Sequence, residues 1–385
     1  MRSCLVRLAT PILLFATGLL SAQSFFNTQG LGEIGRVADA RSASLGTHAA
    51  LSWHNPAWLL RLPRTNITAS LLGAGTVGIE QTGSRFVGTV RPAGFYAGIP
   101  LPLDGRLTLG LDEKFNQDFD IWTAPLPGND YRYRVISRGG VYALKTGLAW
   151  AFLDAGCVGV EYARLLGASR EHWRLEAIDG NSVSVDTIET DYAAHSLKFG
   201  ASSEIGRLGF GAWYAPAVDY QVETLRRVHG VIGESLRLQQ IRLPGTATAG
   251  LSYATTDRLE ISAGIEYRPW SGVTIDNKPA KSWQNAWRAS GGLQLALDTM
   301  RAIRFGYSRS TGYRALDWGT AAARPVTENR LHLGTGLPVD GFGSLDFALE
   351  VGQRANGSLT EYVGRILVSL AYRESWHRRT RRWGY

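Results

Sequence analysis

The chain has 385 residues, of which 44% are hydrophobic and 19% charged, and its formal net charge is +8 at pH 7. The mean hydropathy of −0.10 excludes a helical membrane protein, and the apolar content excludes a disordered chain. This length allows two soluble domains or one large β architecture, and the 45 glycines, 12 tryptophans and 15 tyrosines suit turns and a membrane–water interface.

The N-terminus predicts a secretory signal peptide over residues 1–22. Arg2 and Arg7 form a basic region, residues 9–20 are apolar, and we place the cleavage after the small residue Ala22. The alternative is an uncleaved membrane anchor, but the apolar run is short for a helix that spans a bilayer. No later segment is apolar over such a length. An exported chain of this kind is either soluble or a β-barrel.

The partners expected of the exported chain follow from its charge. The positive net charge predicts contact with outer-membrane lipids and lipopolysaccharide, and nucleic acid is not expected as a partner. The two cysteines are Cys4, which leaves with the signal peptide, and Cys157. The mature chain is therefore expected to have one thiol and no internal disulfide.

Residues 23–62 differ from the rest of the chain. They are rich in glycine, alanine and serine and lack sustained alternation of apolar and polar residues. A short helix is expected within residues 38–50. We therefore predict a small N-terminal segment that precedes the strands.

From Thr65 onward, apolar residues recur at every second position. Residues 258–268 alternate without interruption between an apolar and a polar set, which a β-strand places on opposite faces. Several apolar faces end in an aromatic residue, as a lipid-interface girdle requires. The opposite, polar faces carry Lys145, Glu161, Arg288, Gln294, Arg304, Asp346, Glu350 and Arg365.

Short turns alternate with longer loops between these runs. The short turns fall at residues 153–156, 255–257, 297–299 and 339–341, and the longer loops at 125–130, 178–185, 228–234, 274–282 and 317–327. This pattern predicts an all-β fold, a transmembrane antiparallel β-barrel of about 14 strands over residues 63–373, closed because lipid cannot satisfy unpaired backbone groups. The alternative is a soluble, exported β-sandwich or propeller, against which the charged faces and terminal aromatics argue.

No residue pattern indicates catalysis. The seven histidines are scattered, no pair has metal-ligand spacing, and no nucleotide or nucleophile motif occurs, so neither a metal nor a cofactor is expected. His195 and Ser196 would suit an outer-membrane hydrolase, whereas the favoured interpretation is a histidine in the barrel lumen. Glu260 and Glu266 have basic neighbours on the same face and indicate a hydrated lumen network. We expect that the protein is not an enzyme.

Residues 374–385 form a basic tail that contains both arginines and aromatic residues. Following a last barrel strand, this tail is expected to face lipid head groups on the periplasmic side.

Three places resemble the FadL-like family of outer-membrane long-chain fatty acid transporters. The first is Gly30-Leu31-Gly32, followed by an Ala/Ser-rich stretch and by Asn55-Pro56-Ala57, which resembles the family's N-terminal hatch. The second is Leu243-Pro244 before a hairpin that ends in Tyr267-Arg268-Pro269-Trp270-Ser271. The third is residues 285–291 followed by residues 304–307. The chain departs from the family where residues 51–54 replace acidic residues.

The resemblance implies a fourteen-stranded barrel that carries a hatch over residues 23–62 and transports hydrophobic compounds. The hatch-motif residues would be Gly30, Gly32, Asn55, Pro56 and Ala57. The apolar candidates for contact with a ligand are Phe25, Phe26, Leu31, Ile34, Trp53, Trp58 and Leu59, although the same residues could instead fix the hatch in the barrel.

The sequence therefore predicts a monomeric protein of the bacterial outer membrane that takes up long-chain fatty acids or similar hydrophobic compounds passively. The alternatives are a structural or secretion-associated barrel that binds protein partners and, third, an outer-membrane hydrolase.

Overall fold

The computed structural model describes most of the mature chain. Outside its described residues lie the predicted signal peptide, the candidates Phe25 and Phe26 and, apart from Glu374, the predicted tail. The described residues are 28, 30–35, 39–46, 49–61, 65–80, 83–102, 104–122, 131–152, 156–177, 182–231, 233–281, 283–298, 301–316, 324–339, 343–356 and 360–374.

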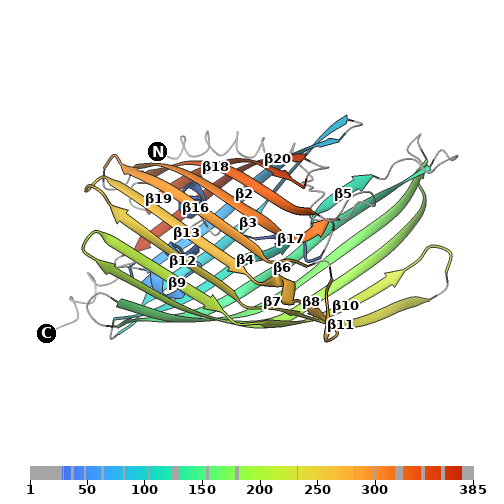
Figure 1. Cartoon of the computed structure of the whole chain (residues 1–385), viewed down its shortest axis with the longest axis horizontal. Helices are drawn as coiled ribbons and strands as arrows, with labels where there is room; N and C mark the ends of the chain where they lie inside the picture. Colours follow the sequence, from blue (N-terminus) through green and yellow to red (C-terminus); the bar gives the residue numbers. More distant parts are fainter. Residues whose placement is uncertain are drawn as a thin grey trace.

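These residues form one antiparallel β-barrel that closes on itself (Figure 1). Each strand pairs with the next, and the first barrel strand, β2, pairs with the last, β20. The strands are β1 (Glu33–Ile34), β2 (Thr65–Glu80), β3 (Gly83–Pro100), β4 (Gly105–Asn116), β5 (Phe119–Trp122), β6 (Tyr131–Phe152), β7 (Gly156–Ala177), β8 (Ser182–Ile205), β9 (Leu208–Ala215), β10 (Val218–Arg227), β11 (Glu234–Leu243), β12 (Thr246–Ala254), β13 (Leu259–Arg268), β14 (Thr274–Ile275), β15 (Lys278–Pro279), β16 (Ala286–Ala296), β17 (Ala302–Leu316), β18 (Arg324–Val339), β19 (Gly343–Ala355) and β20 (Thr360–Glu374). The helices are α2 (Ala40–Ser44) and the 3-10 helices η2 (Ala49–Leu51), η3 (Pro56–Arg61) and η4 (Trp270–Gly272).

Within the described residues, these elements make fourteen strands that form the barrel wall. Three crossing strands are each interrupted by two residues, between β4 and β5, β9 and β10, and β11 and β12. Pro216 and Pro244 cause two of these breaks, because proline has no amide hydrogen to donate to the neighbouring strand. The two breaks lie at the same level of adjacent strands. β1, β14 and β15 are short strands that are not among these fourteen. The prediction of an all-β barrel of about 14 strands is confirmed, although the expected loop at 274–282 contains the short β14–β15 hairpin.

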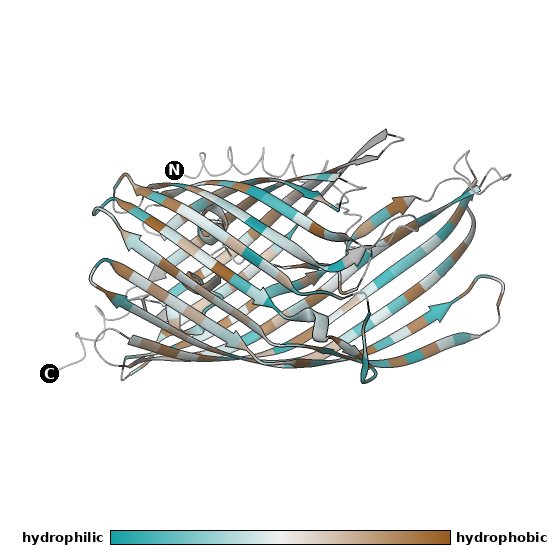
Figure 2. Ribbon diagram, in the orientation of Figure 1, coloured by the Kyte–Doolittle hydropathy of each residue, from teal (hydrophilic) through white to brown (hydrophobic). Residues whose placement is uncertain are grey.

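The two faces of the wall differ in polarity, and the ribbon shows alternating apolar and polar residues along its strands (Figure 2). In β13, Ile261, Ile265 and Tyr267 are 45%, 56% and 46% exposed on the outer face, whereas Ser262 and Arg268 are buried on the lumen face. The alternation predicted for residues 258–268 is thus confirmed. An outer face of this kind matches lipid, and a lumen of charged side chains matches water.

The two ends of the barrel differ in the length of their connections. Short turns follow β3, β6, β8, β12, β16 and β18, whereas most of the connections at the other end are longer. Short turns mark the periplasmic end and long loops the extracellular end. Towards that second end β6, β7 and β8 extend over 22, 22 and 24 residues, and β10 and β11 project past β13 and β16 (Figure 1).

The N-terminal segment, residues 28–61 as far as described, lies inside the lumen. α2 contacts β17 to β20, η2 contacts β9, β12 and β13, and η3 contacts β4 and β6 to β9. Asp39 caps α2, since its Oδ1 accepts a hydrogen bond from the Ser42 amide at 2.8 Å. The short helix expected within residues 38–50 is present as α2 and η2. No helix among the described residues is long and apolar enough to cross a membrane.

Candidate functional site

Wall glycines determine where the N-terminal segment can lie. A β-carbon on Gly159 would lie 2.6 Å from the carbonyl carbon of Pro56, and one on Gly211 would lie 2.3 Å from the carbonyl oxygen of Ala50. Such distances are too short for real contacts, so any larger residue would displace the segment. The lumen-side glycines that approach the segment in this way are Gly159, Gly200, Gly211, Gly306 and Gly334.

The predicted hatch-motif residues make these contacts. Asn55 Nδ2 donates to the carbonyl oxygens of Ala50 and Ala201, and Asn55 Oδ1 accepts from the Ala57 amide. Gly32 has a φ of 82°, and a β-carbon there would lie 2.1 Å from the Asn116 carbonyl oxygen. Asn55 therefore holds a turn against β8, and Gly32 permits the approach of the segment to β4.

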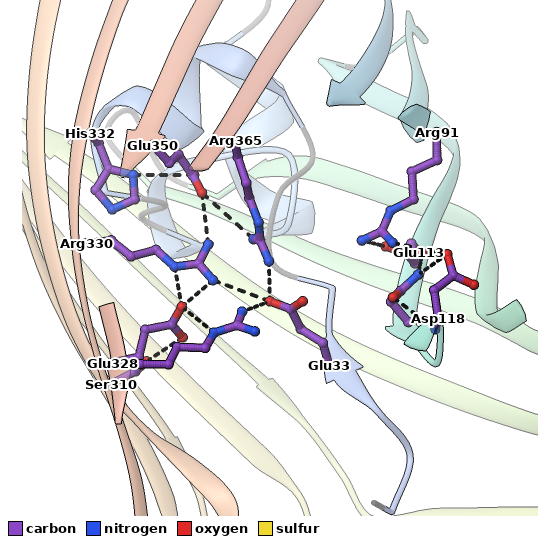
Figure 3. Close-up of polar contacts among 12 residues, drawn as sticks. Glu33, Arg91, Glu113, Asp118, Ser310, Glu328, Arg330, His332, Glu350 and Arg365 are labelled. Atoms are coloured by element: carbon purple, nitrogen blue, oxygen red, sulfur yellow. Dashed lines mark hydrogen bonds and ion pairs between the residues drawn. The ribbon is translucent and has the colours of Figure 1, made fainter. Parts of the chain in front are cut away.

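A cluster of charged side chains ties the start of this segment to the wall (Figure 3). Glu33 Oε1 accepts from guanidinium groups of Arg354 and Arg365, and it lies 3.3 Å from Arg330 Nη2. The Glu33 cluster is completed by Glu328, Glu350 and His332.

The arginines also set the charge of the Glu33 carboxylate. Burial acts to raise the pKa of Glu33, but the surrounding guanidiniums, Arg354 first and then Arg365, hold it well below its usual range. Glu33 is thus ionised at neutral pH, and breaking this buried network would leave unpaired charges in the lumen.

A second row of charges crosses the lumen face of β4, β6, β7 and β8. Asp112 and Lys145 are 2.6 Å apart, Lys145 and Glu161 3.9 Å, and Glu161 and Lys198 2.7 Å. Each charge faces one of opposite sign on the next strand, which offsets the loss of solvation.

His54 and Trp53 of the N-terminal segment pack against this row. His54 Nδ1 lies 3.8 Å from Asp112 Oδ2, but burial, and next the charge of Lys145, lower the pKa of His54 to about 3. His54 is therefore neutral at pH 7, and this contact is not an ion pair. Trp53 stacks on Tyr96 at a centroid distance of 5.4 Å.

An apolar cluster occupies the lumen near the extracellular side, and the sequence did not reveal it. Trp270 lies 4.7 Å from Tyr313 and 5.8 Å from Trp283, measured between ring centroids. The aromatic cluster comprises Phe115, Tyr220, Trp270, Trp283 and Tyr313, which are buried together with Leu31 and Ile34 of the N-terminal segment.

Two β-bulges explain why periodicity misses this cluster. The register of β4 shifts between Glu113 and Phe115, and that of β17 shifts between Thr311 and Ala315. The β4 bulge adds one residue and so places Phe115 on the lumen face, whereas the irregular stretch of β17 adds two residues, and Tyr313 within it is buried in the aromatic cluster. Tyr313 then donates a hydrogen bond to the Gly32 carbonyl oxygen at 2.7 Å and accepts one from the Leu31 amide at 3.1 Å.

Two cavities adjoin the segment. A cavity of about 340 Å³ lies beside the aromatic cluster and is lined by Leu31, Tyr192, Ile241, Trp283 and Arg314, among others. A larger one of about 520 Å³ lies towards the periplasmic side and is lined by Trp53, Trp58 and many polar residues.

The predicted ligand candidates are therefore divided among different places. Gly30 and Leu31 line the smaller cavity, Ile34 is buried in the aromatic cluster, and Trp53 and Trp58 line the larger cavity. Leu59 lies in η3, but its side chain is outside the described residues. Contact of any of these side chains with a ligand stays a prediction.

The lumen position expected for His195 is wrong, and the geometry does not support a hydrolase site made of His195 and Ser196. His195 is exposed on the outer face of β8, where its Nδ1 lies 2.5 Å from the Tyr162 hydroxyl, whereas Ser196 follows on the lumen face. Adjacent residues of a strand point to opposite faces, so Ser196 and His195 cannot act as nucleophile and base together. Among the described residues, no group of three or more His, Cys, Asp or Glu could hold a metal ion.

A closed fourteen-stranded barrel with an apolar exterior, a charged lumen and an internal N-terminal segment is a transmembrane β-barrel of the outer-membrane type. The location predicted in the bacterial outer membrane agrees with this class.

Comparison with known proteins identifies the fold more closely. The chain matches no family model and no curated protein. It is similar to a solved structure of a Pseudomonas aeruginosa FadL homologue, with 12% identity, a TM-score of 0.62, and coverage of 89% of this chain and 100% of that chain. The Ralstonia pickettii toluene transporter TbuX is 13% identical, with a TM-score of 0.61 and coverage of 89% of this chain and 99% of that chain. The P. putida toluene transporter TodX is 14% identical, with a TM-score of 0.61 and coverage of 90% of this chain and 100% of that chain. The chain therefore has the FadL-like fold, as its resemblance predicted.

Proposed function

We propose that the protein takes up hydrophobic compounds passively through the outer membrane, with residues 23–62 as a hatch. The observation that carries this proposal is the aromatic cluster, which lies inside an otherwise charged lumen next to a cavity of about 340 Å³. A water-filled pore has no use for buried aromatic side chains in its lumen, whereas an apolar solute gains about 0.8 kcal/mol for each methylene that it buries there.

The proposed substrates are long-chain fatty acids or similar hydrophobic compounds. Among the solved structures with this fold are toluene transporters and a monoaromatic hydrocarbon channel, which supports the inclusion of aromatic hydrocarbons in this class. We further propose that outer-membrane lipids and lipopolysaccharide surround the barrel and that it acts as a monomer.

A gap in strand pairing suggests the exit route. The pairing of β3 with β4 ends at Gly94 and Asp112, and beyond it β4 pairs with β1 of the N-terminal segment instead. Arg91 and Glu113 form an ion pair of 2.9 Å beside this gap. We propose that substrate moves from the aromatic cluster, to which Phe115 belongs, through the wall at this place after the segment shifts.

The test measures uptake of labelled toluene and of a labelled long-chain fatty acid by cells with an intact lipopolysaccharide layer, which is the barrier that apolar compounds meet. Ile241→Glu puts a charge into the smaller cavity, and we expect it to reduce uptake severalfold. Leu238→Glu makes the same change on the same strand but on its outer face and serves as the matched control.

Equal uptake of both compounds by cells with and without the protein would show that the proposal is wrong. The alternative of a structural or secretion-associated barrel, motivated by the tail and by the departure of residues 51–54 from the family's hatch, stays a prediction; apart from Glu374, the tail lies outside the described residues. Nothing in the lumen geometry specifically favours that alternative.

A further inference from the structure

Three polar side chains occur together on the lipid-facing wall of β7 and β8. Arg164 and His195 are register partners on the outer face, and Tyr162 stacks on His195 at a ring-centroid distance of 5.8 Å. Their neighbours on the same face, Leu166 and Leu197, are exposed and apolar. An arginine among lipid-facing leucines is unfavourable unless an anion or the head-group layer compensates its charge.

The chain itself does not supply that anion. Among the residues that the structure describes, Arg164 has neither an ion pair nor a hydrogen-bond partner. His195 uses Nδ1 towards Tyr162, which leaves its Nε2 directed away from that bond. Opposite residues of an antiparallel pair have β-carbons about 5 Å apart, so the guanidinium and the imidazole can reach one small anion together.

The height of these residues places them at the outer edge of the membrane. β7 begins at Gly156 on the periplasmic side. With a rise of about 3.3 Å per residue and a strand tilt of about 40°, Arg164 lies about 20 Å above the periplasmic end of β7. The apolar band of such a barrel is about 25 Å tall, so Arg164 lies near its outer edge. On the flanking strand β6, the exposed Tyr142 is the register partner of Leu166 and so lies next to this level, as expected of an interfacial girdle.

We propose that Arg164, His195 and Tyr162 bind a phosphate group of lipopolysaccharide in the outer leaflet. Arginine presents a planar set of donors that matches phosphate, and the hydrogen-bonded pair of Tyr162 and His195 adds a further donor. This binding surface lies on the outside of the wall and is independent of the lumen and of the proposed uptake.

The test titrates the detergent-solubilised, full-length protein with bisphosphorylated lipid A and counts bound lipid by native mass spectrometry. Arg164→Leu matches the neighbouring leucines and is therefore compatible with the lipid-facing wall. We expect it to weaken binding on the order of tenfold, as the loss of a charge-assisted contact implies. His195→Phe keeps the ring but removes its nitrogens, and it should also weaken binding.

Arg309→Leu is the matched control, because Arg309 is an exposed arginine near the outer end of β17 that has Asn329 rather than a histidine as its register partner. We expect this variant to bind lipid A as the wild-type protein does. Three results would each overturn the proposal: equal losses in Arg164→Leu and Arg309→Leu, undiminished binding of dephosphorylated lipid A, or equally tight binding of phosphatidylglycerol.

Discussion

Glu33 is the residue on which the attachment of the N-terminal segment depends most directly. Its carboxylate contacts Arg330, Arg354 and Arg365, which come from three adjacent wall strands. Removing one member of a buried charge network typically costs about 3–5 kcal/mol, because the remaining charges lose their partners.

We expect Glu33→Gln to release the start of the segment while the barrel stays closed. Limited proteolysis should then cleave residues 28–61 faster than in the wild-type protein, and single-channel conductance should rise. Glu266→Gln removes the carboxylate from the 2.7 Å contact with Arg268 on the wall and should leave both readouts unchanged. Unaltered proteolysis of Glu33→Gln would contradict the role assigned to this carboxylate.

The pKa of Glu33 predicts how this attachment depends on pH. Because the folded pKa lies below the ordinary carboxyl value of 4.5, the contribution of Glu33 to stability is complete above that value and is lost as pH falls through the folded pKa. Conductance should therefore stay constant from pH 8 down to pH 5. A rise with a midpoint near 4.5 would mean that the arginines do not hold the ionised form.

Residue-level predictions from sequence succeeded where one strand supplies the pattern. Lys145, Glu161 and Glu350 were correctly assigned to the lumen face from alternation alone. Glu33 was not singled out, because its partners lie about 300 positions away and no local pattern connects them.

At the scale of elements, the match between N-terminal segment and wall depends on glycine. We expect Gly159→Ala to displace η3, since the added carbon would overlap the main chain of Pro56. Gly364→Ala is the control, because nothing lies within 4 Å of the added carbon. Proteolysis of the segment should accelerate only in Gly159→Ala, and the heat-induced shift in gel mobility should show a closed barrel in both.

The elements that sequence did not resolve are those in which regular alternation breaks. The hatch motifs include Gly32, which has a φ of 82°, and Asn55, whose side chain bonds to main-chain atoms, and Pro244 falls at a break in a strand. The register irregularities at Phe115 and Tyr313 carry no comparable signal. The aromatic cluster therefore required the three-dimensional register.

For the whole molecule, the division between lipid-facing and lumen-facing surfaces makes a quantitative prediction. Ile265→Arg places a charge on the lipid-facing side of β13, where such a change costs about 2–4 kcal/mol near the bilayer midplane. Leu238→Arg should cost little, since its outward neighbours Glu223 and Gln240 are polar and indicate a position above the apolar band. Denaturant unfolding in lipid vesicles measures the loss in free energy of unfolding for each variant. Equal losses for the two variants would refute this assignment of the membrane boundary.

The closed architecture was predictable because one physical rule, the satisfaction of every backbone group in lipid, acts on all crossing strands alike. The internal arrangement follows no such general rule. It depends on contacts between residues that are distant in sequence, such as Leu31 with Tyr313.

The contacts of Gly159, Gly211 and Gly306 with main-chain atoms have a consequence for how such proteins can diverge. At these points the wall recognises the path of the N-terminal backbone rather than the identity of its side chains. Side chains of the segment that do not face these glycines are free to change, provided that the turns at Gly32 and Asn55 and the ion pairs of Glu33 persist. Substrate preference could therefore be altered by mutations within the segment without any redesign of the barrel that surrounds it.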